Sequence, residues 1–225
     1  MKKNIYCVFD TETIGIEKKL IYDLGLVITA KKGDILHRKQ WIIEEVFTNK
    51  SLMKQAYYGY KKALFYEPLL NKNPELLVSF STAKKEFNEI LREYSVSHIS
   101  AYNLMFDMSA ISQTLKQLNI EGKFLEMSLN YFDLWAACCL TIFQHKRFQK
   151  MAINEGWLTQ AGNIRTSAEI AYRYLTENVD FIEQHTALSD ASIEADILQY
   201  MLRQKKAFPK NTIKHHPWRL VQKKK

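Results

Sequence analysis

The start of the chain places two acids where a buried strand ends. Residues 5–15 read IYCVFDTETIG, and four of the first five are apolar, as in a strand that enters a hydrophobic core. Residues two apart on a strand point to the same face, so Asp10 and Glu12 lie side by side. Carboxylates this close repel each other, and burial increases the cost. Two interpretations stay open: a solvated pair at a sheet edge, or a site for a divalent cation such as Mg²⁺.

The rest of the chain alternates strand and helix patterns. Gly33 and Asp34 suit a tight turn between two strands, and Pro68 marks the end of a helical pattern. We expect strands at 5–12, 21–30, 35–45 and 96–103, helices at 47–66, 81–94, 104–118, 131–143, 167–176 and 186–206, and a hairpin at 157–166. Strands followed by strands mixed with helices predict an α/β or α+β arrangement around a mixed sheet.

Length and cysteine content limit the class of protein. The 225 residues suit one domain with appendages, and no apolar run approaches the roughly 20 residues that span a bilayer. Three cysteines, of which Cys138 and Cys139 are adjacent, do not form a disulfide framework. We therefore expect a cytoplasmic protein without a membrane partner, with both of these cysteines in the core.

The net charge of +8 is concentrated at the C-terminal end. Residues 201–225 hold nine basic residues and no acid, so the first 200 residues, with 23 basic and 24 acidic, sum to −1. A basic tail suggests a polyanionic partner, although a solvated tail that only aids solubility is also common. Because Pro209 and Pro217 interrupt any helix, we expect an extended, mobile tail at 208–225, which would hold nucleic acid by its phosphates, after a domain at 1–207.

Two later segments add acids to the first pair. Asp107 follows the strand expected at 96–103 and falls in the first turn of a helix, where an acid also suits the helix dipole. His185 precedes Asp190 by five residues at the start of the last helix. Taken alone, these two can be a helix-start histidine and a surface acid. Asp190, however, lies near the apolar face of its helix, and a buried unpaired acid is costly unless it binds a metal.

Taken together, the three segments resemble a known set of motifs. Asp10-Thr11-Glu12-Thr13, the run from Asn103 to Asp107 and the run from His185 to Ala191 resemble the three motifs of the DEDD exonuclease superfamily, and the histidine spacing resembles its DEDDh branch. The resemblance spans roughly residues 5–202. It implies an α/β, ribonuclease-H-like fold with a mixed five-stranded sheet flanked by helices.

In its finer features the chain shows one further similarity and two departures from the family pattern. The stretch from Thr166 to Leu198 is also similar to stand-alone exonucleases encoded by phages. Tyr102 stands where many members carry histidine, and the gap before the third motif is long and includes the 157–166 hairpin.

The resemblance also implies roles for individual residues. Two Mg²⁺ or Mn²⁺ ions, and no other cofactor, would be held by Asp10, Glu12, Asp107 and Asp190. His185 would act as general base toward a water molecule. Contacts to the terminal nucleotide would come from Thr11, Thr13, Ile14, Gly15 and Asn103.

The expected activity is 3′–5′ exonuclease cleavage of nucleic acid to nucleoside 5′-monophosphates, with single-stranded DNA preferred over RNA. An exoribonuclease of the same branch is the first alternative, and a catalytically idle nucleic-acid-binding module is the second. A polymerase or other replication partner stays open.

Several other residues carry two interpretations each. Arg165 and Trp157 of the hairpin can contact phosphate and base, or the hairpin can be a surface ornament. An aromatic series can stack bases, although helical spacing favours core packing: Tyr57, Tyr58, Tyr60, Phe65 and Tyr66. The pair His215-His216 is better explained as solvated than as a metal site, and Asp133 resembles a helix N-cap.

Overall fold

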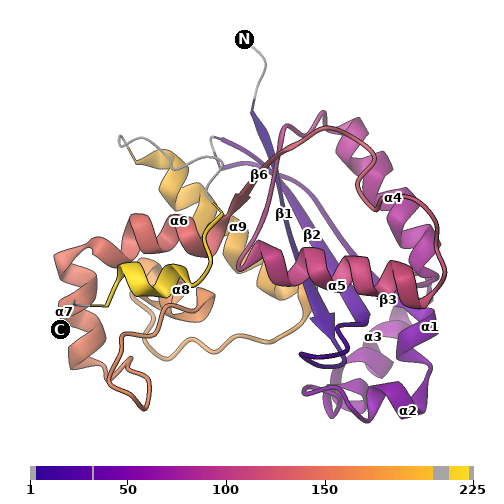
Figure 1. Ribbon diagram of the computed structural model, residues 1–225, viewed down its shortest axis with the longest axis horizontal. Coiled ribbons are helices and arrows are strands. Elements are labelled where there is room, and N and C mark those ends of the chain that lie inside the picture. Colours follow the sequence, from indigo (N-terminus) through magenta and orange to yellow (C-terminus); the bar gives the residue numbers. More distant parts are fainter. Residues whose placement is uncertain (1–3, 32, 205–212, 223–225) are drawn as a thin grey trace.

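A six-stranded mixed sheet is the frame of the molecule (Figure 1). The computed structural model describes residues 4–31, 33–204 and 213–222. The strand order is β4-β3-β2-β1-β5-β6. Strands β1, β2 and β3 pair antiparallel, whereas β5 runs parallel to β1, β6 to β5 and β4 to β3. The strands are β1 Ile5–Thr13, β2 Ile21–Ala30, β3 Ile35–Ile43, β4 Leu77–Val78, β5 His98–Ala101 and β6 Asn130–Asp133.

Helices cover both faces of the sheet. They are α1 Glu44–Phe47, α2 Lys50–Met53, α3 Glu67–Lys72, α4 Phe80–Glu93, α5 Leu104–Gln117, α6 Leu134–Leu140, α7 Lys146–Asn154, α8 Ala168–Thr176 and α9 Ala187–Arg203. Single helical turns of other types occur at Lys62–Tyr66, Pro74–Leu76, Ile142–Gln144 and Pro217–Leu220. Among the described residues, no helix has both the length and the apolar content needed to cross a bilayer.

The central strand β1 supplies both layers of the core. Cys7 and Phe9 pack into a cluster with α1, α4 and α5, whereas Tyr6 and Val8 face a second cluster built by α6, α7, α8 and α9. This alternation is the two-residue period of a strand, and coverage of both faces explains why the run is apolar throughout. Cys138 and Cys139 are buried free thiols in the second cluster, as the sequence predicted.

The sequence predicted four of the six strands. It missed β4, which has two residues, and β6, which overlaps the start of the helix expected at 131–143. Pairing with β5 makes β6 a strand, and a pairing across the sheet leaves no local signal. Asp133 ends β6 and caps α6 by accepting from the Ala136 amide at 3.2 Å, which confirms its predicted role.

The helix expected at 47–66 is also interrupted. It is replaced by α1, α2, a turn and a π-helical segment at Lys62–Tyr66. Asn49 caps α2 through the amides of Ser51 and Leu52. At Gly59 the chain passes so close to α2 that an added Cβ would lie 2.6 Å from the Met53 carbonyl oxygen. A continuous helix would not bring Gly59 this close to Met53. It would also place the aromatic side chains of this segment at different positions.

The start of α9 is fixed against β2 by two residues. A Cβ on Gly25 would lie 2.4 Å from the carbonyl carbon of Ala187, so only glycine permits this approach. Asp23, fully buried, accepts hydrogen bonds from the Ala187 amide at 3.0 Å and from the Tyr66 hydroxyl at 2.8 Å. It accepts a third from Gln40 Nε2 at 2.9 Å. One carboxylate therefore positions both α9 and the π-helical segment.

The C-terminal segment differs from the predicted extended tail. Pro217 begins a 3-10 turn, which Pro suits at a first helical position, and Val221 is buried among residues of α6 and α7. Gln144 donates to the Leu220 carbonyl at 3.0 Å, and Gln222 exchanges two hydrogen bonds with the backbone of Ile164. The expectation of an extended, mobile chain is therefore wrong for 217–222. Residues 208–212 and 223–225 of the predicted tail lie outside the described residues, and the domain boundary after 207 remains a prediction.

We predict that Asp23→Ala lowers the free energy of unfolding by at least about 2 kcal/mol, because three buried donors lose their acceptor. Asp23→Asn should cost less, since its oxygen can accept from Ala187 and Tyr66 while the Gln40 amide turns over. Urea unfolding of the two variants and the wild type measures the difference. Equal costs for both variants would contradict the role assigned to these hydrogen bonds.

Candidate active site

Three elements bring four acids to one edge of the sheet. Asp10 and Glu12 lie at the carboxyl end of β1, and Asp107 lies in the first turn of α5, directly after β5. Because β1 and β5 are parallel, their carboxyl ends meet at the same edge. Asp190 comes from the first turn of α9 on the opposite face. The structure thus brings together four acids that the chain separates by as many as 180 positions.

Burial and mutual repulsion raise the pKa values of these carboxyls. Burial, with Asp190 as the strongest neighbouring charge, raises the pKa of Glu12 to about 9. Burial, then Asp107 and Glu194, holds the pKa of Asp10 well above its usual range. Burial raises the pKa of Asp107 to about 7, although hydrogen bonds from Thr11 oppose that rise. Without a cation, this cluster holds protons that exposed carboxyls would lose at neutral pH.

One buried carboxylate oxygen of the cluster, Asp190 Oδ1, is suited to bind a cation. Asp190 Oδ1 is buried and has no hydrogen-bond partner among the described residues. The ligand atoms of Glu12, His185 and Asp190 lie within 4.8 Å of one another, which is close enough to share one ion. Clustered carboxylate oxygens are the ligands that Mg²⁺ and Mn²⁺ prefer. The donor set therefore fits a hard divalent cation.

His185 is held in a defined orientation at the rim of the cluster. Its backbone has φ of 52°, a strained value for a non-glycine residue, directly before the Thr186 N-cap of α9. Its ring stacks on Tyr58, with centroids 4.3 Å apart and planes 13° from parallel. Lys61 Nζ donates to the His185 carbonyl at 3.2 Å and lies 4.8 Å from the centre of the Tyr58 ring. His185 Nδ1 is 3.7 Å from Asp190 Oδ2.

Three charged residues of the site were missed from the sequence. Glu194 is buried, and its Oε2 accepts from the Tyr102 amide at 3.1 Å. It follows Asp190 by four residues and so shares its helix face, a spacing that could have indicated it. Glu183 approaches His185 Nδ1 at 3.9 Å. Lys61 comes from the turn after α2, and nothing in its local sequence indicates that it reaches the cluster.

The residues predicted to contact the nucleotide differ in whether their polar groups are already hydrogen-bonded within the protein. The amide and hydroxyl of Thr11 both donate to Asp107 Oδ1, at 3.1 and 2.7 Å, so this amide is not free for a substrate. Ile14 is buried in the core, and Thr13 donates to the Gly15 carbonyl at 3.1 Å. Asn103 has φ of 71° at the start of α5, and its amide donates to Asp133 Oδ1 at 3.3 Å. Substrate contact therefore remains a proposal for all five residues: Thr11, Thr13, Ile14, Gly15 and Asn103.

The predicted aromatic contacts also change. In the aromatic series, core packing holds for Tyr66, which is fully buried, whereas Tyr57 is 82% exposed and Tyr60 is 63% exposed. Trp157 is only 4% exposed, because the turn after α7 folds it against Phe148. The base contact predicted for Trp157 is therefore wrong. The hairpin itself is present, with Leu158 bridged to Ile164. His215 and His216 are exposed, as expected.

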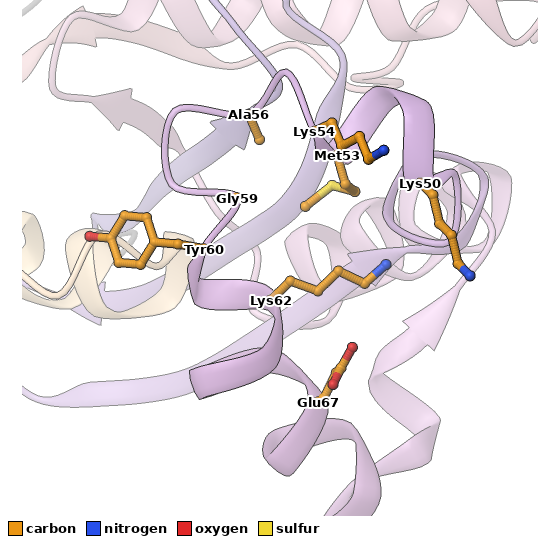
Figure 2. Close-up of a pocket in the computed structure, with 8 residues that line it drawn as sticks. All are labelled: Lys50, Met53, Lys54, Ala56, Gly59, Tyr60, Lys62 and Glu67. Atoms are coloured by element: carbon orange, nitrogen blue, oxygen red, sulfur yellow. The ribbon is translucent and has the colours of Figure 1, made fainter.

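A lysine-lined cavity opens along the same α2 to α3 segment (Figure 2). Its volume is about 470 Å³, and Lys50, Lys54 and Lys62 line it together with Tyr60 and Glu67. Lys62 Nζ donates to the Phe47 carbonyl at 2.8 Å, and Glu67 supplies a negative charge. The cavity is therefore of mixed charge.

Solved exonuclease structures share this fold. Escherichia coli exonuclease I in complex with a 5cy-dA13 oligonucleotide matches 90% of the chain with a TM-score of 0.57 and 12% identity. The zinc-bound form of its single-stranded DNA complex matches 88% with a TM-score of 0.55 and 11% identity. A moderately thermophilic exonuclease I from Methylocaldum szegediense matches 90% with a TM-score of 0.53 and 12% identity.

These matches bear on the fold. The chain spans about 40% of the length of the proteins it matches. At this identity the likeness shows the fold alone, and it confirms the ribonuclease-H-like α/β arrangement expected from the sequence, with six strands in place of five. No protein-family model matches the chain. No curated protein matches it either.

The pKa of Glu12 predicts how stability depends on pH. Because this pKa is raised from 4.5 to about 9, the metal-free fold should lose stability as the pH rises through that interval. We expect the midpoint temperature of unfolding in EDTA to fall by at least about 5 °C, and MgCl₂ to reverse the loss. Glu12→Gln should reduce this dependence without abolishing it, because the pKa values of Asp10 and Asp107 are also raised, while exposed Glu17→Gln should leave it unchanged. A wild-type midpoint independent of pH in EDTA would contradict the assignment.

Proposed function

We propose that this protein is a metal-dependent 3′–5′ exonuclease of the DEDDh type that acts on single-stranded DNA. The observation that carries the proposal is the convergence of Asp10, Glu12, Asp107 and Asp190, with a buried Asp190 oxygen that has no hydrogen-bond partner in the described part of the chain. An idle binding module has no use for acids that repel each other in this way. The fold likeness to exonuclease I, whose structures include complexes with single-stranded DNA, supports the same reaction and substrate.

The four carboxylates would hold two Mg²⁺ or Mn²⁺ ions. Bound there, the ions would stabilise the charge on the attacking and leaving oxygens. His185 would take the proton of the attacking water, since its imidazole lies at the rim of the cluster, with Nδ1 3.7 Å from Asp190 Oδ2. Its contacts with Tyr58 and Lys61 hold the ring in place for that step. The products would be a nucleoside 5′-monophosphate and a strand shortened by one nucleotide.

The preference for DNA and the cellular location belong to the same proposal. The bound strands in the matching structures are DNA. An exoribonuclease would use the same acids and differ in contacts to the 2′-hydroxyl. The three buried free thiols suit a reducing compartment, which supports the cytoplasm.

We predict that Asp10→Ala or Asp190→Asn abolishes Mg²⁺-dependent release of mononucleotides from 3′-labelled DNA, because each removes a ligand of the proposed ions. Both variants should be at least as stable as the wild type in EDTA, since each relieves repulsion. Asp34→Ala, at an exposed turn, is the matched control. Near-normal cleavage by Asp10→Ala would refute the metal assignment. The same assay with RNA separates the two substrate classes.

His185→Ala is expected to lower turnover about 10²- to 10⁴-fold, as loss of a general base does. Mn²⁺ binding, followed by calorimetry, should persist because the four carboxylates remain. His215→Ala, at an exposed position, should leave turnover unchanged. A pH–rate profile of the same shape before and after His185→Ala would exclude His185 as the base.

A further inference from the structure

A second pocket lies between α6, the hairpin and the C-terminal segment. Its volume is about 280 Å³, and its lining includes Trp135, Thr166, Arg165, Trp218 and Gln222. We propose that this pocket binds a base and phosphate of the single strand on the 5′ side of the cleaved nucleotide. The inference rests on the proposed function and adds a subsite to it.

The pocket is tied to the acid cluster by a chain of hydrogen bonds. Thr166 accepts from the Tyr102 hydroxyl through its carbonyl at 2.6 Å, and from Trp135 Nε1 through its hydroxyl at 2.9 Å. The Tyr102 amide donates to Glu194, which repels Asp10 within the cluster. One tyrosine therefore links the wall of the pocket to the buried acids. A strand whose 3′ end lies at those acids has to leave along a neighbouring surface. Trp135 follows the carboxyl end of β6, which runs parallel to β5 and therefore ends at the same edge of the sheet as the acids.

The side chains of the pocket suit a nucleotide. Trp135 is partly exposed and pairs with Tyr102, with ring centroids 6.3 Å apart and planes at 22°. Trp218 is also partly exposed, and the Arg219 guanidinium lies 5.4 Å from its ring. Arg165 is exposed at the rim, and none of the described lining residues is acidic. Indole rings stack on any base, and guanidinium groups pair with phosphate, so the pocket complements an unpaired strand without reading its sequence.

The pocket exists because the C-terminal segment docks. The side chain of Gln222 accepts from the Ile164 backbone amide at 3.1 Å and donates to the Ile164 carbonyl at 3.2 Å. These two hydrogen bonds join the C-terminal segment to the hairpin. Val221 is buried in the cluster that includes α6, and its backbone amide donates to the carbonyl of Trp218, which lines the pocket, at 3.1 Å. The segment thus completes a binding surface in place of the mobile tether expected from the sequence. The lysine-lined cavity of Figure 2 is less suited to a phosphate, because Glu67 places a negative charge in its lining.

The test compares a long and a minimal substrate. Trp135→Ala, Trp218→Ala and Arg165→Ala are assayed on a 15-nucleotide dT strand and on the p-nitrophenyl ester of thymidine 5′-monophosphate, which has no upstream nucleotide. Each tryptophan variant should lower the ratio of kcat/KM for the two substrates about tenfold, through KM of the strand. Trp135→Phe should recover most of this loss. Arg165→Ala should reduce the slope of log affinity against log salt by about 0.7.

Controls separate the subsite from folding and from the proposed reaction. Lys85→Ala removes one positive charge from α4, where the side chain is 76% exposed, and should leave the ratio unchanged. Urea unfolding identifies any variant that fails to fold, and Arg165→Ala, at the surface, then carries the test. If the wild type cleaves neither substrate, the proposed function fails, and fluorescence anisotropy of the dT strand still tests the pocket. Unchanged ratios and unchanged strand affinity in all three variants would overturn the subsite.

Discussion

The contact between β2 and the start of α9 is the constraint on which the site depends. Gly25 lets the backbone of Ala187 come within reach, and Asp23 then receives the amide of that residue. The same carboxylate accepts from Tyr66, which anchors the segment that carries Tyr58. Burial raises the pKa of Asp23 to about 6, and the three donors oppose that rise. His185 and Asp190 flank this contact, so the residues that we propose as general base and metal ligand are positioned by it.

The buried acid cluster is where electrostatic repulsion destabilises the fold most. Burial keeps the pKa of Glu194 well above its usual range, as it does for Asp10, so these carboxyls retain protons when no cation is bound. Lys61 is a cation near the cluster, and its attraction opposes the rise in the pKa of Glu12. A fold normally avoids such an arrangement, because an unpaired buried charge is worth several kcal/mol of destabilisation. Its presence at the carboxyl ends of two parallel strands is the strongest physical argument for a cation and an anionic substrate.

Sequence reasoning was most reliable where a local pattern carries the signal. The apolar run before Asp10 predicted β1, the periodic apolar residues predicted α4, α5, α8 and α9, and the adjacent cysteines were predicted to be core. It was least reliable between 47 and 66 and near Trp157. In the first region, helical spacing suggested one continuous helix. In the second, a hairpin expected at the surface suggested an exposed Trp157 side chain. Packing against α2 and Phe148 decided otherwise.

The sequence by itself determined which acids are available and which elements carry them, because strand and helix periods are local properties of the chain. It also indicated that His185 precedes a helix bearing Asp190. Only the tertiary structure decided that Lys61 and Tyr58 join them, since these contacts cross turns and layers whose geometry no short stretch encodes. The same holds for the C-terminal segment: its prolines argued for an extended chain, but burial of Val221 and the pairing of Gln222 with Ile164 outweigh the local preference.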